Sequence, residues 1–290
     1  PQGPTSTDCL EKIKHRLGQK KIGHAGTLDP NARGLLIVLL GQATKLAPYL
    51  GQGRKTYLGR LRLGLETDSY DIQGKILAER PWPETSPELI REEIRSWKYL
   101  EQQQVPPFSA AKHKGKPLYA RMRQGRYVPE KLKKISIDQA ELLDLHFPEV
   151  FFRVVCSQGT YIRSLAHSLG KRLGCGAVLT ELVREKSEPF DLARAHHLMD
   201  ILEDPKGLEG RVLSIADSLS GWPRIRLDDR QTRDIKNGLW LPAQSLYEEV
   251  SAGPGDTALF VTREGEPVAL AKAREQDDRL FWTVLRGLWS

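Results

Sequence analysis

The stretch KIGHAGTLDPNARGLLIVLLGQATK, residues 21–45, places one carboxylate on a glycine-punctuated loop directly before an apolar run. The run at 35–40 predicts a short buried strand. Asp29 precedes Pro30, and Asp before Pro is ordinary turn chemistry, so a solvated turn is the simplest interpretation of the loop. A single acid at the mouth of a buried strand can also serve catalysis, and the rest of the chain has to decide between these interpretations.

Hydrophobic spacing predicts further elements on both sides of this stretch. We expect a helix over 6–18, capped by Ser6 or Thr7 and ended by Gly18, and a half-buried strand over 56–67. A second helix is predicted over 87–100 and a buried strand over 150–157. After that strand, Thr160 is a plausible N-cap for a helix whose apolar residues recur at Ile162, Leu165, Ala166, Leu169 and Leu173.

The length of 290 residues favours two domains over one. A small, mainly stranded unit is predicted to begin at GWPRIRL (221–227), with its clearest strands at TALFVTRE (257–264) and PVALAKARE (267–275). We therefore place the boundary near Ser220.

The formal net charge of +7 is concentrated in one segment. Residues 112–134 carry nine basic side chains against the single acid Glu130, together with Tyr119 and Tyr127. A solvated face is the ordinary interpretation of such a charge run. Basic residues interleaved with aromatic ones also suit a phosphate backbone that carries stackable bases. A second basic cluster at 12–21 leads into the opening stretch, and the two clusters together favour a nucleic-acid partner.

Several other classes of function are disfavoured. The three cysteines show no CxxC spacing and are interpreted as reduced, buried or incidental thiols, and the scattered histidines do not suggest a metal site. GQGRKT (51–56) has Arg54 where a phosphate-binding loop needs glycine, so nucleotide-driven chemistry is not expected. No apolar run approaches 18 residues and no signal peptide is recognisable. The first residue is Pro1 and not Met, so we expect the natural N-terminus to lie upstream.

Arg163 falls in the first turn of the helix predicted after Thr160. A cation there opposes the helix dipole at a cost of roughly 0.3–1 kcal/mol, unless an anion neutralises it. A solvated surface arginine is one possibility. The other is a bidentate pair with Asp29, which would hold that acid ionised and fixed in orientation.

Five blocks of the sequence, in order, carry a family resemblance: GHAGTLDPNARG, KTY, QVPPFSAAKHKGKPLY, GTYIRSLAHSLG and LTELVRE. They resemble the TruB family, bacterial enzymes that convert uridine 55 of tRNA to pseudouridine, and the match extends over essentially the whole chain. The resemblance implies an α+β catalytic domain, here 1–220, around a central mixed, largely antiparallel sheet. It also implies a small C-terminal, mainly-β PUA domain that binds RNA, here 221–290.

The resemblance assigns roles to individual residues. Asp29 matches the catalytic aspartate, Arg163 the arginine that pairs with it, and Tyr57 the tyrosine that stacks on the target base. Tyr57 is also a candidate for assisting proton removal from C5. Tyr161 and Leu182 match positions that contact the substrate.

RNA binding is assigned in the same way. His24 matches a histidine that fills space in the T-loop when bases leave it. The segment 105–134, including Lys112, Lys114 and Lys116, resembles an insertion that clamps the T-arm. Two departures stand out: the family's lysine before Pro1 lies off this chain, and Val183 follows Leu182 where arginine is frequent.

The implied reaction breaks the N1–C1′ bond, rotates the base and joins C5 to C1′, so it needs no cofactor and no metal. The base has to be flipped out of a folded RNA. Asp29 would act as an anion, either as nucleophile on the sugar or as base in an elimination that forms a glycal, and the sequence leaves both open.

The expected partner is the T-stem-loop of tRNA, with no obligatory protein or guide RNA, for a monomer in the cytoplasm. Two alternatives remain: a guide-RNA-dependent, dyskerin-type synthase, and a non-catalytic RNA-binding module or chaperone. The second would need the basic segments but not Asp29, Tyr57 and Arg163 together.

Overall fold

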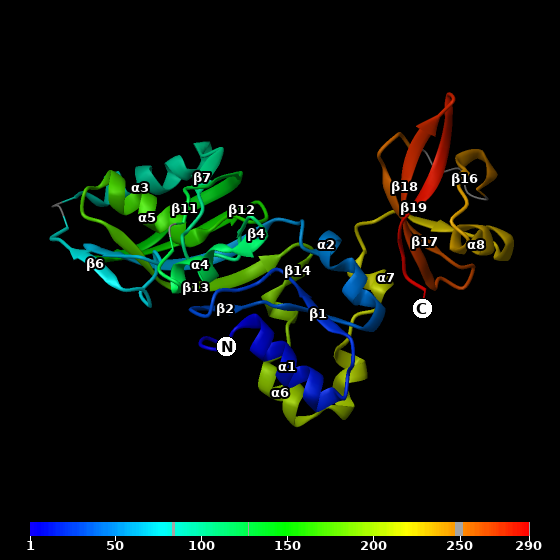
Figure 1. Ribbon diagram of the computed structural model, residues 1–290, viewed down its shortest axis with the longest axis horizontal. Coiled ribbons are helices and arrows are strands. Elements are labelled where there is room, and N and C mark those ends of the chain that lie inside the picture. Colours follow the sequence, from blue (N-terminus) through cyan, green and yellow to red (C-terminus); the bar gives the residue numbers. More distant parts are fainter. Residues whose placement is uncertain (83–84, 127, 247–251, 290) are drawn as a thin grey trace. The chain divides into compact units, whose positions relative to one another are not determined.

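The computed structural model describes residues 1–82, 85–126, 128–246 and 252–289 (Figure 1). The chain forms two compact units. The first comprises residues 1–8, 27–36 and 51–195, and the second comprises 9–26, 37–50 and 196–290. The expected domain boundary near Ser220 stays a prediction. Within the described residues, no helix combines the length and the apolar character that crossing a membrane requires.

The first unit contains β2 (Ala32–Gly34), β4 (Lys55–Leu63), β5 (Leu65–Thr67), β6 (Ile76–Glu79), α3 (Pro87–Arg95), η2 (Ser96–Tyr99), β7 (Gln102–Gln104), β8 (Lys112–His113), β9 (Lys116–Pro117), α4 (Leu118–Arg123), β10 (Leu132–Lys134), β11 (Ile137–His146), β12 (Glu149–Cys156), α5 (Ile162–Arg172), β13 (Ala177–Ser187), β14 (Phe190–Asp191) and η3 (Leu192–Arg194). Its main sheet has six strands in the order β11-β12-β4-β13-β14, with β2 pairing β13. Among the described strand pairs of this sheet, only β2–β13 is parallel. The expected α+β class and the mixed, largely antiparallel sheet are therefore confirmed.

One face of this sheet carries the core of the first unit. Alternate residues of β4 are buried, as the half-buried pattern predicted, although the predicted strand divides into β4 and β5 at Gly64. Helices α3 and α5 cover the same face, because their apolar residues join those of β4 and β12 in a single cluster. Gly59 makes room for the ring of Phe152, since a Cβ at Gly59 would lie 2.2 Å from it. Phe152 in turn packs edge-on against Trp97 of η2.

The second unit contains β1 (Ile22–Ala25), β3 (Ile37–Leu40), η1 (Gly41–Leu46), α2 (Ala47–Leu50), α6 (Leu198–Glu203), η4 (Lys206–Arg211), α7 (Ile215–Ser218), β15 (Arg224–Arg226), α8 (Asp229–Lys236), β16 (Leu241–Pro242), η5 (Ala243–Ser245), β17 (Thr257–Val261), β18 (Pro267–Gln276) and β19 (Arg279–Gly287). Helix α1 (Ser6–Leu17) begins in the first unit and continues into the second. The C-terminal strands form a five-stranded sheet in the order β15-β17-β18-β19-β16 around a core that includes Phe260 and Trp282. The mainly stranded C-terminal region is confirmed.

Three local predictions need correction. Helix α1 is capped at Thr5 and not at the predicted Ser6 or Thr7. The Thr5 hydroxyl accepts the backbone N–H of Asp8, and the Asp8 carboxylate accepts the backbone N–H of Thr5. The predicted strand 35–40 begins only at Ile37 and is half-buried, because Leu35 donates its N–H to the main chain of Arg184 instead. The helix predicted over 87–100 is an α-helix, α3, only as far as Arg95, and the chain then forms the short helix η2 up to Tyr99.

Candidate active site

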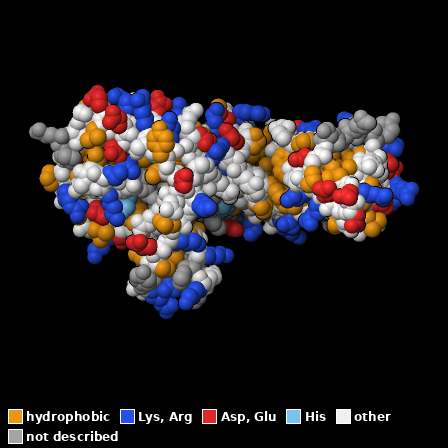
Figure 2. Space-filling model, turned by 90° about the horizontal axis from the view of Figure 1, so that it is seen from above, with side chains coloured by type: hydrophobic (Ala, Val, Ile, Leu, Met, Phe, Trp, Pro, Cys, Tyr) orange, Lys and Arg blue, Asp and Glu red, His pale blue; other side chains and the backbone are white. Residues whose placement is uncertain are grey.

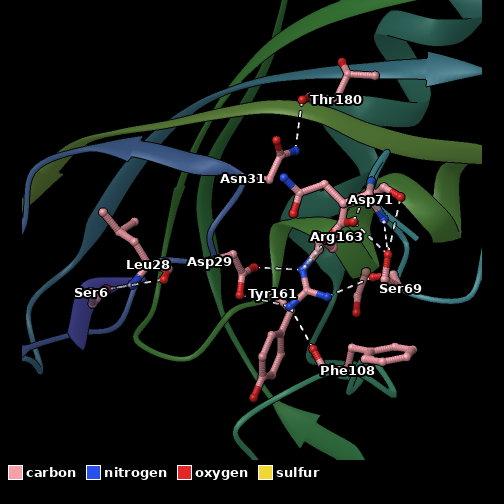
Figure 3. A network of polar contacts seen from close by, with 12 residues as sticks. Ser6, Leu28, Asp29, Asn31, Ser69, Asp71, Phe108, Tyr161, Arg163 and Thr180 are labelled. Carbon is pink, nitrogen blue, oxygen red and sulfur yellow. Dashed lines mark hydrogen bonds and ion pairs between the residues drawn. The ribbon is translucent and has the colours of Figure 1, made fainter. Parts of the chain in front are cut away.

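The loop that carries Asp29 is anchored on both sides of the acid (Figure 3). The hydroxyl of Ser6 accepts the N–H of Leu28 at 3.0 Å and lies 3.3 Å from the carbonyl oxygen of the same residue. On the other side, Asn31 donates from Nδ2 to the carbonyl of Thr180 in β13 at 3.0 Å. The loop is therefore not a freely solvated turn: hydrogen bonds to α1 and to the sheet fix the residues that flank the carboxylate.

Arg163 pairs with Asp29 through two parallel hydrogen bonds, as the helix-dipole argument predicted. Nε donates to Oδ2 at 2.7 Å and Nη2 donates to Oδ1 at 3.0 Å. The arginine side chain is 5% exposed, whereas the aspartate side chain is 39% exposed. Both carboxylate oxygens are thus oriented from the protein side, while the acid remains open to a reactant on the other side.

The rest of the guanidinium is fixed by two further segments (Figure 3). Nη1 donates to the carbonyl of Ser69 at 2.8 Å, and Nη2 also donates to the carbonyl of Phe108 at 3.1 Å. Nε lies 3.6 Å from Oδ2 of Asp71. Every nitrogen of the fork therefore has an acceptor, and the arginine cannot turn without breaking several of these contacts.

Asp71 is a second acid beside the same arginine. Its side chain is 10% exposed, and its Oδ1 accepts the Ser69 hydroxyl at 2.7 Å and the N–H of Gln73 at 3.1 Å. Two carboxylates thus share one buried cation, and only Asp29 is open to solvent. The asymmetry favours Asp29 as the reactive acid and Asp71 as a group that orients Arg163.

Helix α5 begins one residue later than predicted, with Tyr161 at the N-cap instead of Thr160. The side-chain amide of the buried Gln103 in β7 makes two hydrogen bonds with the main chain of Tyr161. Its Oε1 accepts the Tyr161 N–H at 2.5 Å, and its Nε2 donates to the Tyr161 carbonyl at 3.2 Å. These bonds replace a side-chain cap, which Thr160 does not provide because its hydroxyl donates to the carbonyl of Ser157.

Two aromatic residues stand close enough to the Asp29–Arg163 pair to respond to its charges. Burial raises the pKa of Tyr57 in β4 to about 12; the neighbouring Arg184 opposes this shift and Asp29 adds to it slightly. Burial also raises the pKa of Tyr161, with Ser109 and Arg163 opposing that shift. Both phenols are therefore neutral at pH 7. Lys133 of β10 lies 5.9 Å from the centre of the Tyr161 ring.

The remaining predicted site residues are spread over both units. Leu182 is buried in β13, beside Ala32 of β2 and Gly59 of β4. His24 lies on β1 in the second unit. Lys112 and Lys114 are exposed on the small β8–β9 hairpin of the first unit. Lys116 belongs to β9, but its side chain, like the whole of Tyr127, lies outside the described part of the chain.

The basic segment is not a separate attachment to the site. It begins close to Phe108, whose carbonyl binds Arg163, and is closed by the pairing of β7 with β10. On the face of the molecule shown in Figure 2, Lys and Arg side chains are widely spread and interspersed with Asp and Glu. Among the described residues, no group of three or more His, Cys, Asp or Glu side chains is arranged to hold a metal ion.

Sequence reasoning missed Asp71, Gln103 and the two carbonyl groups that bind Arg163. Asp71 lies in ETDSYDIQG, which looks like an ordinary turn between strands. Gln103 lies in a run of three glutamines that suggests only a polar surface. The signal that could have found Asp71 is the charge of Arg163: a buried guanidinium accommodates more acceptors than one carboxylate supplies.

Similarity to known proteins identifies the family of the chain. Residues 14–162 match the family model described as TruB family pseudouridylate synthase (N terminal domain). A tRNA pseudouridine synthase B from Nitratidesulfovibrio vulgaris (strain Miyazaki F) is 49% identical over 292 residues, covering 100% of this chain and 94% of the relative. Another, from Oleidesulfovibrio alaskensis, is 50% identical with the same coverage.

Solved structures resemble this chain over its whole length. A chain of a Cbf5-Nop10-Gar1 complex superposes with a TM-score of 0.74 at 24% identity, covering 100% of this chain and 83% of that one. A chain of an H/ACA RNP bound to a substrate RNA containing 2′-deoxyuridine gives a TM-score of 0.72 at 22% identity, with the same coverage. At this identity the likeness concerns the fold alone.

Proposed function

Because the chain belongs to the TruB family of pseudouridylate synthases, we propose that it isomerises uridine 55 in the T-loop of tRNA to pseudouridine. Relatives named tRNA pseudouridine synthase B match its full length at 49–50% identity, so the chain is an isomerase that acts on tRNA. The observation that carries the proposal is the pairing of a half-open carboxylate, Asp29, with a buried arginine fork.

The proposed chemistry assigns the reaction to Asp29. Its ionised carboxylate either attacks C1′ of the target nucleotide or removes a proton from the sugar in an elimination, and either step breaks the N1–C1′ bond. After the base rotates, C5 joins C1′ as the bond between Asp29 and C1′ breaks or, in the elimination, as Asp29 returns the proton to the sugar. C5 then loses its proton and N1 takes one up, so that Asp29 is regenerated and all atoms are conserved. Arg163 touches both oxygens of the acid and so sets the direction of either step without itself being consumed.

Tyr57 suits the stacking role better than the role of a base. With a pKa of about 12 its phenol is neutral at pH 7, so it offers an uncharged ring to the flipped base and an O–H that donates a hydrogen bond. Before it could take the proton from C5, the phenol would first have to lose its own proton. Tyr161, at the N-terminus of α5, and Leu182, in β13, would contact the same nucleotide.

RNA binding would use other parts of the chain. Exposed lysines of the segment 105–134 would neutralise phosphates of the T-arm, His24 would occupy the space left in the T-loop, and 221–290 would act as a PUA-like RNA-binding domain. With the basic segment as its own RNA-binding element, the chain would need neither guide RNA nor protein partner, and we propose that it acts as a monomer in the cytoplasm.

The test is conversion of an unmodified tRNA transcript by the purified protein alone. We expect pseudouridine at position 55 and nowhere else, and none in a transcript with cytidine at that position. Conversion only after addition of a guide RNA and accessory proteins would show the dyskerin-type alternative instead. Tight binding without conversion under any of these conditions would show a non-catalytic RNA-binding module.

A further inference from the structure

Tyr70 has a backbone conformation that is unusual for its side chain. Its φ is +67°, in the left-handed region that glycine and asparagine tolerate and that is rare for a bulky residue. Tyr70 is nevertheless 8% exposed, and its main chain is tied to β13, because its carbonyl accepts the N–H of Leu179 at 3.0 Å. Such a conformation persists only where the surroundings enforce it.

The residues on either side of Tyr70 are the two that bind Arg163 from this turn. The carbonyl of Ser69 accepts Nη1, and the carboxylate of Asp71 lies beside Nε (Figure 3). The left-handed residue therefore stands between two contacts on the same guanidinium. A change of backbone angle at Tyr70 would move one contact relative to the other and would displace the fork that holds Asp29.

The ring of Tyr70 stacks on His167 of α5. The ring centroids are 3.7 Å apart and the planes differ by 9°. His167 lies four residues after Arg163, so both side chains project from the same face of the helix. Burial lowers the pKa of His167 to about 4, so the stack joins two neutral rings at pH 7. Helix α5, which carries Arg163, thus also packs through His167 against the turn that binds Arg163.

Neither partner has another evident reason to be aromatic and polar. Nδ1 of His167 is buried without a hydrogen-bond partner among the described residues, so a hydrogen bond at this nitrogen does not explain the histidine. Glycine at position 70 would adopt the same φ without strain. The tyrosine is therefore explained by its ring, which fixes the turn against α5.

We propose that Tyr70 and His167 are positioning residues, whose stacked rings hold the Ser69–Asp71 turn against Arg163 and so orient the catalytic carboxylate of Asp29. This inference rests on the proposed function. It assigns neither residue a contact with the RNA. It differs from a packing role, because a packing role is satisfied by any apolar side chain of similar volume, whereas stacking requires a flat ring.

The experiment compares variants that keep a ring with variants that lose it. His167→Phe and Tyr70→Phe keep the stack; His167→Leu fills the space without a ring, and Tyr70→Gly relieves the backbone but removes the ring. Because a misplacement of about 1 Å can cost on the order of a hundredfold, we expect His167→Leu and Tyr70→Gly to slow single-turnover conversion of tRNA at least about tenfold. The Phe variants should stay within about twofold of the parent, and tRNA affinity should change little in all four.

A second arm asks whether the effect passes through Arg163. In a background that already carries Arg163→Lys, His167→Leu should cost much less than it does alone, because residues that act as one unit are not additive. Thermal unfolding of each variant identifies any that fails to fold, and the Phe variants remain informative in that case.

Three results would overturn the inference: conversion by Tyr70→Gly at the parental rate, equal slowing by His167→Leu and His167→Phe, and full additivity with Arg163→Lys. A parent protein that binds tRNA but forms no pseudouridine would overturn the proposed function instead, so the two failures are distinguishable.

Discussion

In the proposed function, the Arg163 network and the basic segment 105–134 would serve one reaction, and the two are built in opposite ways. Arg163 is 5% exposed and each nitrogen of its fork meets an acceptor. Lys112 and Lys114 are exposed on a hairpin whose two strands have two residues each. A phosphate can be neutralised from many side-chain conformations, whereas a carboxylate has to meet one atom from one direction. In the proposed function, the residues of the chemistry are thus preorganised, whereas those that would bind RNA are left adaptable.

The contrast predicts that changes in the Arg163 network lower the rate of conversion and leave tRNA affinity nearly unchanged. The largest such effect is expected at Asp29. Asp29→Asn keeps the shape of the side chain but removes its charge and its ability to act as nucleophile or base. Pseudouridine formation should fall to background, with tRNA affinity within severalfold of the parent. Single-turnover conversion and a binding titration measure the two quantities, and appreciable conversion by this variant would contradict the assignment of Asp29.

The next largest effect is expected at the arginine. Arg163→Lys keeps the charge but not the planar fork, so the acid can swing, and a loss of about a hundredfold in single-turnover rate is expected with nearly intact affinity. Arg163→Met should be slower still, because it leaves two carboxylates without their cation, and a carboxylate in a poorly solvated site tends to take up a proton.

A T-arm stem-loop with saturating enzyme is a suitable substrate for this comparison, since it removes binding from the measured rate. Should Arg163→Lys lose rate and affinity in equal proportion, Arg163 would be an RNA contact, and the division between a rigid network and an adaptable grip would not hold.

The parts of the site that the sequence predicted are those that follow from local rules. Arg163 near a helix N-terminus demanded an anion, and the structure supplies Asp29. The alternation in 56–67 predicted the strand that buries Tyr57. Threonine is a favoured N-cap residue, so the sequence predicted the cap at Thr160. The structure places it at Tyr161, whose main-chain N–H and carbonyl both bind Gln103, a residue distant in sequence.

The parts that could not be predicted depend on contacts between distant segments. Asp71, Ser69 and Phe108 bind Arg163 from positions 92, 94 and 55 residues away in sequence, and two of these three contacts are made by main-chain carbonyls, which every residue has. The left-handed backbone of Tyr70 is likewise invisible in a sequence, because that conformation normally indicates glycine. Tertiary structure, and not local propensity, selects these groups.

A smaller effect, of the opposite kind, is expected in the basic segment. Neutralising Lys112, Lys114 and Lys116 to Gln should weaken tRNA binding and reduce the log–log salt slope by about 0.7–0.9 for each phosphate that a lysine no longer neutralises. The rate at saturating enzyme should remain parental. A matched control is the neutralisation of Lys75, Arg95 and Lys98, which are exposed elsewhere in the first unit and remove the same charge. An unchanged slope in the first triple variant, or an equal change in the control, would show that the hairpin lysines do not bind RNA.

The smallest effect on activity at neutral pH is expected from His167→Phe. This variant nevertheless sharpens the comparison, because a buried titratable group makes stability depend on pH, whereas an exposed segment does not. Burial lowers the pKa of His167 to about 4 in the folded protein, with Lys171 as a smaller contribution in the same direction and Glu66 opposing it. The unfolded chain takes up this proton near pH 6.5, so the stability gained from a neutral His167 is complete above that pH. It is lost as the pH falls from about 6.5 towards about 4, by up to roughly 3 kcal/mol at 1.36 kcal/mol per pH unit.

His167→Phe cannot titrate, so its free energy of unfolding should fall less steeply across this window, while every other titrating group is shared and cancels in the difference. Urea unfolding of the two proteins at a series of pH values measures this difference. Parallel curves for the parent and His167→Phe would mean that His167 takes up its proton as readily in the folded protein as in the unfolded chain, and the contrast between a buried network and an exposed basic segment would not extend to this stack.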